Sequence, residues 1–211
     1  MIAVLDYGIG NLRSAEKALQ HVGADARLVD SPEAAAGASG VVLPGVGAFG
    51  ACAEALRASG LDETVRAAIG EGRPFLGICV GLQLLFEGSE EDPQVPGLGI
   101  MKGSVRAIAE TERRPQMQWN LVHRPAGQSS RLLGDDREQW FYFVHSYVPV
   151  PEGQEDLASV VGTCQYGGDL AVAFERGNLF ATQFHPEKSA SAGLGLLARF
   201  ARICAEAAEE P

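Results

Sequence analysis

Hydrophobic and polar positions follow one another in the first half of the chain in blocks that predict strands and helices by turns. Ile2–Leu5 is an uninterrupted apolar run, which is typical of a strand buried on both faces. Apolar positions recur every three or four residues over Leu12–Val22, which predicts a helix ending at Gly23. The same reasoning predicts strands at Asp25–Val29, Gly40–Leu43 and Pro74–Ile78, and helices at Ala51–Ser59, Leu61–Ile69 and Val80–Phe86. Since strands and helices alternate with short loops, we expect a mostly parallel sheet with right-handed crossovers.

The second half of the chain has a different hydrophobic pattern, with short β-like runs separated by turn residues. Glu175–Asn178 has the composition of a hairpin turn, so this half is expected to be antiparallel or mixed. Gly193–Ala208 predicts a final amphipathic helix. The expected strands are Gly103–Ile108, Trp119–His123, Gln139–Val144, Ala158–Val161, Leu170–Phe174 and Leu179–Phe184. Without an internal repeat or a linker, the pattern predicts one α/β domain over residues 1–211.

Composition narrows the function classes further. The net charge of −10 over 211 residues argues against a general binder of nucleic acid or anionic membranes, and 46% hydrophobic residues allow a packed core. The first residues lack the basic region of a signal peptide, and no apolar run approaches the roughly 18 residues that span a bilayer. Four cysteines without CxxC spacing argue against a disulfide framework or a zinc site. We therefore expect a cytoplasmic protein with no metal and no cofactor.

Gly77-Ile-Cys79-Val-Gly81 lies where a predicted buried strand turns into a helix. Glycines two residues before and after allow the tight turn of a nucleophile elbow, which places the thiol above the carboxyl end of the sheet. The helix N-terminus favours the thiolate, and the backbone N–H of Val80 is a candidate donor to an oxyanion. An isolated motif of this kind fits a buried structural cysteine equally well.

His185-Pro-Glu187 follows directly after a predicted strand and supplies a base and a group to orient it. Residues two apart in an extended chain point the same way, so Glu187 is expected to reach the imidazole nitrogen that faces away from Cys79. Alone, the segment fits a solvated turn. Together with Cys79 at the end of another strand, it indicates a catalytic triad.

Leu43-Pro-Gly-Val-Gly-Ala-Phe-Gly50 is a glycine-rich loop after a predicted strand. Its exposed N–H groups fit a phosphate nest, but the chain lacks a Walker A or dinucleotide fingerprint. We favour an oxyanion loop facing Cys79. The N–H around Val46 is the candidate donor to the oxyanion in this loop.

The segments Gly77–Gln83 and Gln183–Ser189 together resemble the class I, or triad, glutamine amidotransferases. Within that superfamily, four more segments resemble the glutaminase subunits of imidazole glycerol phosphate synthase, which serve histidine biosynthesis. These segments are Asp6–Asn11, Leu43–Gly50, Met117–Asn120 and Phe143–Tyr147. One departure is Gln118, where the family usually carries glycine.

The resemblance implies a flavodoxin-like α/β fold and the hydrolysis of glutamine to glutamate and ammonia by Cys79, His185 and Glu187. It implies that ammonia passes to a separate cyclase, a (βα)₈ barrel forming a heterodimer with this chain. That cyclase makes imidazole glycerol phosphate and the aminoimidazole carboxamide ribotide. The implied glutamine-binding residues are Gly45, Gly47, Gln83, His145, Ser146 and Tyr147.

Trp119 is expected at the partner interface, because Trp is enriched at binding hot spots, and Trp140 in the core. The other expected interface residues are Asn11, Arg13, Met117, Asn120 and Lys188. Cys52, Cys164 and Cys204 are interpreted as buried small hydrophobes, and Glu90–Asp92 as a solvated loop. The alternative functions are a glutaminase subunit of another synthase, a cysteine hydrolase on the same fold, and a non-catalytic binding subunit.

Overall fold

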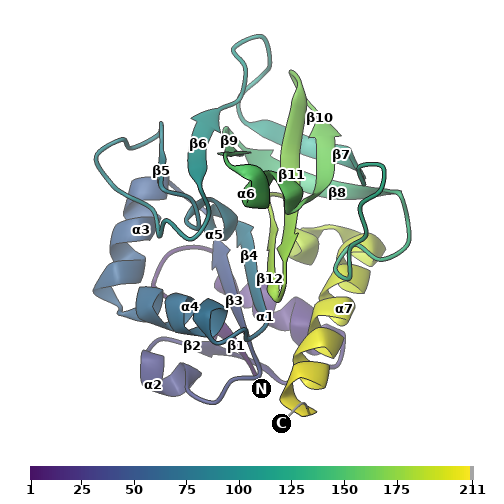
Figure 1. Ribbon diagram of the computed structural model, residues 1–211. Helices are drawn as coiled ribbons and strands as arrows, with labels where there is room; N and C mark the ends of the chain where they lie inside the picture. The colour runs from purple at the N-terminus through teal and green to yellow at the C-terminus, as the bar shows by residue number, and fades with distance from the viewer. Residues whose placement is uncertain (210–211) are drawn as a thin grey trace.

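A nine-stranded sheet runs through the computed structural model, which describes residues 1–209 (Figure 1). The strand order is β2-β1-β3-β4-β12-β11-β10-β7-β8, in which the first five strands are parallel and the others antiparallel to their neighbours. Its strands are β1 Ile2–Leu5, β2 Ala26–Val29, β3 Gly40–Gly45, β4 Phe75–Cys79, β7 Gln116–His123, β8 Glu138–His145, β10 Val160–Gln165, β11 Asp169–Arg176 and β12 Leu179–Thr182. The division into a parallel and an antiparallel half matches the prediction.

Helices cover the parallel half of the sheet on both faces (Figure 1). α1 contacts α7, while α3 and α2 both contact α4 on the opposite face. A second, smaller sheet has the order β5-β6-β9. The remaining elements are α1 Leu12–His21, α2 Pro32–Ala35, α3 Phe49–Ala58, α4 Leu61–Gly70, α5 Val80–Gln83, β5 Gly88–Ser89, β6 Gly103–Ala107, β9 Tyr147–Pro151, α6 Gln154–Ala158, the 3₁₀ turn Pro186–Lys188 and α7 Ala190–Glu209.

The structure differs from the sequence prediction mainly where elements are short or polar. β9 was not predicted because Pro149 and Pro151 remove backbone donors, which a strand at the edge of a sheet tolerates. The predicted strand Ala158–Val161 was wrong at its start, since Ala158 ends α6 and β10 begins at Val160. The helix predicted over Val80–Phe86 is a single turn that ends at Gln83.

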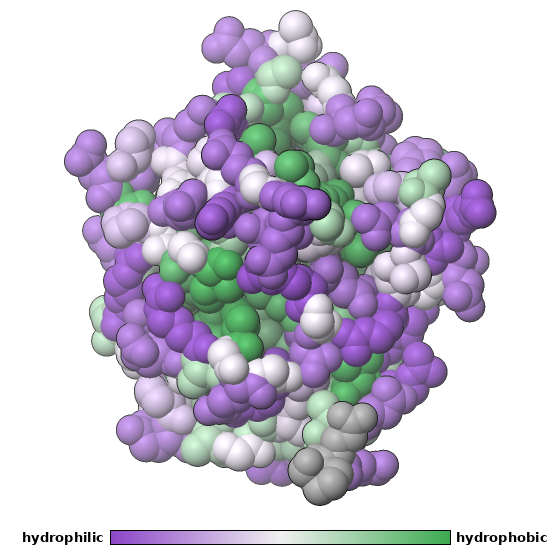
Figure 2. All heavy atoms as spheres, viewed as in Figure 1, coloured by the Kyte–Doolittle hydropathy of each residue, from purple (hydrophilic) through white to green (hydrophobic). Residues whose placement is uncertain are grey.

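The carboxyl ends of β3, β4 and β12 meet at one edge of the sheet. In their register Gly45 is opposite Cys79, and Thr182 is opposite Ile78. Parallel strands present ligand sites at this edge, so the fold brings the glycine-rich loop, the cysteine and the histidine segment together. No helix within residues 1–209 is long and apolar enough to cross a bilayer. The face in Figure 2 is mostly hydrophilic, with hydrophobic side chains gathered in patches.

Candidate active site

Cys79 ends β4 in a strained backbone conformation, with φ of 55° and ψ of −110°. Positive φ is costly for a residue with a side chain and persists only where the surrounding structure enforces it. The two flanking glycines allow the surrounding backbone to pack closely enough to hold it. A Cβ on Gly81 would lie 1.8 Å from the carbonyl oxygen of Leu43, and one on Gly77 would lie 2.9 Å from that of Gly81. The predicted elbow is therefore formed, with its thiol nearly buried.

His185 follows β12, and its Nδ1 lies 2.8 Å from Oε1 of Glu187. Because a carboxylate only accepts, Nδ1 carries a proton and Nε2 is the nitrogen left to exchange one. The extended backbone expected here was wrong, since Pro186–Lys188 forms a 3₁₀ turn, but the turn still brings the carboxylate to the ring. The hydroxyl of Ser189 donates to the His185 carbonyl at 2.6 Å and accepts from the N–H of Tyr142 at 2.9 Å. This bracing holds the backbone that carries the imidazole.

The electrostatics of His185 favour its protonated form. Burial alone would lower its pKa, but the adjacent Cys79 and Glu187 outweigh burial and raise the pKa to about 9. Nε2 makes no hydrogen bond of ordinary geometry, although the thiol is close enough to affect the ring. At neutral pH this raised pKa favours a proton on Nε2 as well as on Nδ1 of His185.

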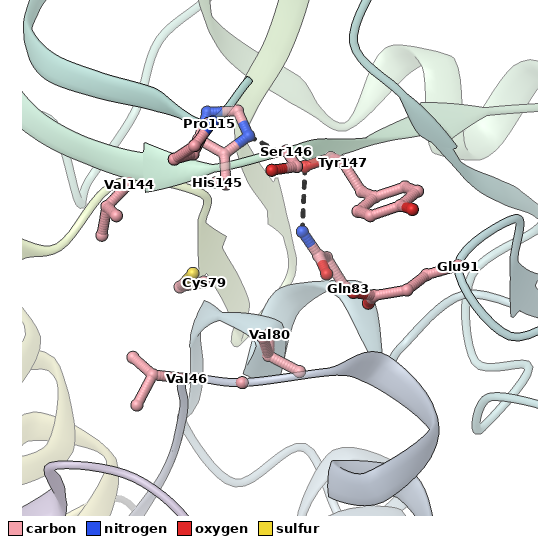
Figure 3. Close-up of a pocket in the computed structure, with 11 residues that line it drawn as sticks. Val46, Cys79, Val80, Gln83, Glu91, Pro115, Val144, His145, Ser146 and Tyr147 are labelled. Carbon is pink, nitrogen blue, oxygen red and sulfur yellow. Dashed lines mark hydrogen bonds between the residues drawn. The ribbon is translucent and has the colours of Figure 1, made fainter.

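A pocket of about 250 Å³ opens over Cys79, and Figure 3 shows the residues around it. It brings together most of the residues assigned to oxyanion stabilisation and glutamine binding from the sequence. Gly45 is not among the lining residues; it ends β3, where a Cβ would be 2.8 Å from the hydroxyl of Tyr7. The lining residues are Val46, Gly47, Cys79, Val80, Gln83, Glu91, Pro115, Val144, His145, Ser146 and Tyr147.

The carbonyl of Tyr147 organises the binding side of the pocket (Figure 3). It accepts from Nε2 of Gln83 at 3.0 Å and from Nδ1 of His145 at 2.8 Å. Burial lowers the pKa of His145 to about 4, against the raising effect of this hydrogen bond, and His185 lowers it further. His145 is consequently neutral at physiological pH.

Two side chains hold the glycine-rich loop from behind. The hydroxyl of Tyr7 donates to the carbonyl of Pro44 at 2.9 Å, and Sγ of Cys52 lies 3.8 Å from the carbonyl of Val46. Burial raises the pKa of the Cys52 thiol, so it remains a protonated donor. Cys52, Cys164 and Cys204 are all free and buried, as predicted, but Cys52 also contacts the loop.

Sequence reasoning missed two residues of this region. Glu91 is exposed, as expected for a solvated loop, but it also lines the pocket and accepts from the N–H of Phe49 at 2.8 Å. Gln183 donates from Nε2 to Sγ of Cys79 at 3.6 Å. Its place in the motif Gln183–Ser189 could have signalled a role, whereas no local pattern indicates that the loop of Glu91 folds back over the site.

One face of β7 and β8 carries the exposed side chains of Met117, Trp119 and Trp140 and the half-buried Tyr142. We call it the outer β7–β8 face. Trp119 is 44% exposed and Met117 is 64% exposed. The prediction that Trp140 lies in the core was wrong, since it is 56% exposed on the same face. Gln118 lies in the regular strand β7 opposite Phe143, so the chain needs no glycine there. The remaining expected interface residues, Asn11, Arg13, Lys188 and Asn120, are exposed or half-buried.

Comparison with known proteins gives consistent matches over the whole fold. The family model "Glutamine amidotransferase class-I" matches residues 3–203. A protein of Synechococcus sp. (strain JA-3-3Ab) named imidazole glycerol phosphate synthase subunit HisH is 47% identical over 97% of this chain and 94% of its own length. A protein of the same name from Acinetobacter baylyi is 46% identical over 94% of this chain and 96% of its own. A solved glutamine amidotransferase superposes with a TM-score of 0.76 at 22% identity, covering 97% of this chain and 100% of its own, which supports the fold.

Proposed function

This chain belongs to the class-I glutamine amidotransferase family, and we propose that it acts as the glutaminase subunit of imidazole glycerol phosphate synthase in histidine biosynthesis. The observation that carries the proposal is Cys79 at a strained elbow beside His185 and Glu187, at the base of a pocket lined by Gln83. The near-full-length similarity to subunits of that synthase supports the choice of pathway.

The triad performs hydrolysis in two steps. Nε2 of His185 holds the proton from the Cys79 thiol, and Sγ attacks the carboxamide carbon of glutamine. The backbone N–H of Val80, which has no partner within its own helix, and an N–H of the loop at Val46 stabilise the oxyanion. His185 then gives its proton to the departing ammonia, leaving a glutamyl thioester on Cys79. Water activated by His185 hydrolyses the thioester to glutamate.

The pocket suits a free amino acid better than a peptide. Its volume of about 250 Å³ has room for one small molecule. Glu91 supplies a carboxylate that pairs with the α-ammonium group of glutamine. Gln83, His145, Ser146 and Tyr147 line the same pocket together with Gly47. Gly45 lets the end of β3 pack closely against Tyr7 and Val80.

Ammonia then goes to a separate cyclase subunit, a (βα)₈ barrel that binds this chain as a heterodimer. The outer β7–β8 face is the main docking surface, because it exposes large apolar side chains beside the site. Met117 is opposite Val144 in the sheet register, and Val144 lines the pocket. Asn11, Arg13, Asn120 and Lys188 complete the rim of the interface.

The loop Pro44–Gly47 couples hydrolysis to the partner. Its carbonyls at Pro44 and Val46 are held from behind by Tyr7 and Cys52, which fixes one orientation of the peptides. Partner binding reorients the peptide at Val46 and so completes the oxyanion hole. Glutamine turnover by the isolated chain should therefore be low, and full turnover without a cyclase would contradict this coupling.

The proposed function is tested by separating the two ammonia sources. In the complex with its cyclase, Cys79→Ala should abolish synthesis driven by glutamine and spare synthesis driven by added ammonium. Loss of both activities in a folded complex, or retention of the glutamine-driven activity, would overturn the proposed division of labour.

A further inference from the structure

Gln183 connects the nucleophile to the substrate-binding side of the pocket. It follows β12 directly, its side chain is completely buried, and its backbone N–H donates to the carbonyl of Val172 at 2.9 Å. Its Nε2 donates to Sγ of Cys79 at 3.6 Å, and its Oε1 accepts from Nε2 of Gln83 at 3.1 Å. One rigidly placed amide therefore contacts both halves of the site.

The hydrogen-bond network fixes the orientation of both amides. Gln83 donates its two Nε2 protons to the carbonyl of Tyr147 and to Oε1 of Gln183. Its own Oε1 is thereby kept as an acceptor, and in Figure 3 it points away from Tyr147, on the side where Glu91 enters the pocket. Because Oε1 of Gln183 accepts, its Nε2 has to face the sulfur. Reversing one of the two amides would place two N–H donors or two carbonyl oxygens against each other.

We propose that Gln183 is a positioning residue that stabilises the thiolate of Cys79 and sets Gln83 as a hydrogen-bond acceptor for the substrate. An N–H donor interacts more strongly with a thiolate than with a thiol, so this contact favours the reactive form. Burial removes competing water and strengthens the effect. This inference rests on the proposed function, because it assumes that Cys79 is the nucleophile and glutamine the substrate.

Other titratable groups also face Cys79, and a test of Gln183 has to leave these residues unchanged. They are His185 after β12, Tyr7 after β1 and Cys52 on α3. Glu187 acts through His185, and Glu91 lines the same pocket. Substitution of Gln183 leaves all five in place, so a change in the titration of the sulfur reports on the amide itself.

The experiment follows the rate at which iodoacetamide alkylates Cys79 as a function of pH, with the modified peptide identified by mass spectrometry. Gln183→Glu keeps an acceptor for Gln83 but replaces the donor with a negative charge. Its alkylation midpoint should rise by about one pH unit or more. Gln183→Met removes donor and acceptor without a charge, and its midpoint should rise by about half a unit or more. The exposed Gln154→Glu is the matched charge control and should keep the wild-type midpoint.

Steady-state kinetics of the complex separate the two roles. Gln183→Glu should lower kcat about tenfold or more while changing KM for glutamine by less than about twofold, since Gln83 keeps its acceptor. Gln183→Met should also raise KM, because Gln83 loses that partner. A merely structural residue would give neither the titration shift nor this contrast between the variants.

Wild-type midpoints in both folded variants would overturn the inference. If Gln183→Glu does not fold, Gln183→Met decides alone, by the presence or absence of its upward shift. Failure of the proposed function would show itself differently, as glutamine hydrolysis that persists in Cys79→Ala. The alkylation rate does not depend on the identity of the substrate, so the two failures can be told apart.

Discussion

Replacing His145 by phenylalanine should reduce the drop in the free energy of unfolding that the protein shows on acidification. His145 is buried and neutral, and its pKa of about 4 lies below the ordinary value near 6.5. In the unfolded chain the imidazole takes up a proton that the folded chain excludes. Its contribution is therefore complete above the unfolded pKa and is lost as pH falls through the folded pKa.

The size of this effect follows from the two pKa values. Each unit of difference corresponds to about 1.4 kcal/mol, so acidification from neutral pH to about pH 5 should cost about 2 kcal/mol through His145 alone. His185 acts in the opposite pH range. Its folded pKa is raised to about 9, so its contribution is complete below about pH 6.5 and is lost as pH rises toward that folded value. Because both proteins keep His185, its contribution cancels when the pH dependence of the wild type is compared with that of the variant.

Urea unfolding followed by circular dichroism measures the effect, with the free energy of unfolding determined at about pH 7 and about pH 5. Buried carboxylates make the stability of both proteins depend on pH. The quantity to compare between wild type and variant is therefore the slope, meaning the change in the free energy of unfolding between the two pH values. The exposed His21→Asn should keep the wild-type slope. If His145→Phe loses as much stability as the wild type over this range, the assignment of a neutral, desolvated His145 is refuted.

Two further substitutions test the elbow and the docking surface. Gly81→Ala should cost about 3 kcal/mol of stability or more in thermal or urea unfolding, because its Cβ would collide with the carbonyl of Leu43. Gly70→Ala, whose Cβ would have no atom nearby, should not destabilise the protein. Equal stability of the two variants would contradict the packing argument. Trp119→Ala should weaken cyclase binding by about 2 kcal/mol in calorimetry. Leu157, which is exposed outside the outer β7–β8 face, provides the control, and Leu157→Ala should not weaken binding. An unchanged affinity for Trp119→Ala would remove that face from the interface.

The sequence predicted the parallel core well because its strands are continuous apolar runs. β1 has the predicted bounds, and β3 and β4 differ by one or two residues at their ends. Polar and edge elements were harder, since β9 contains prolines and gains its stability from a partner strand far away in sequence. Trp140 illustrates the same limit. A strand pattern gives two faces, but only tertiary packing decides that Phe141 and Phe143 point inward and Trp140 outward.

The candidate site shows a similar division between local and long-range information. The elbow at Cys79 and the pair His185 and Glu187 are encoded in short motifs, and the sheet register brings them to one edge. Glu91 reaches the pocket through a loop that folds back onto the N-terminus of α3, which no local pattern predicts. The contact between Gln183 and Cys79 joins strands β12 and β4, so it emerges only when those strands pair.

The central claim is that Cys79 attacks the carboxamide carbon of glutamine. A diazoketone analogue of glutamine alkylates a nucleophile placed at that carbon, so the site of modification identifies the attacking atom. We expect inactivation of the complex that glutamine slows, with the label on the peptide containing Cys79 and none on Cys79→Ala. A label on another residue, or inactivation that glutamine does not slow, would contradict the account.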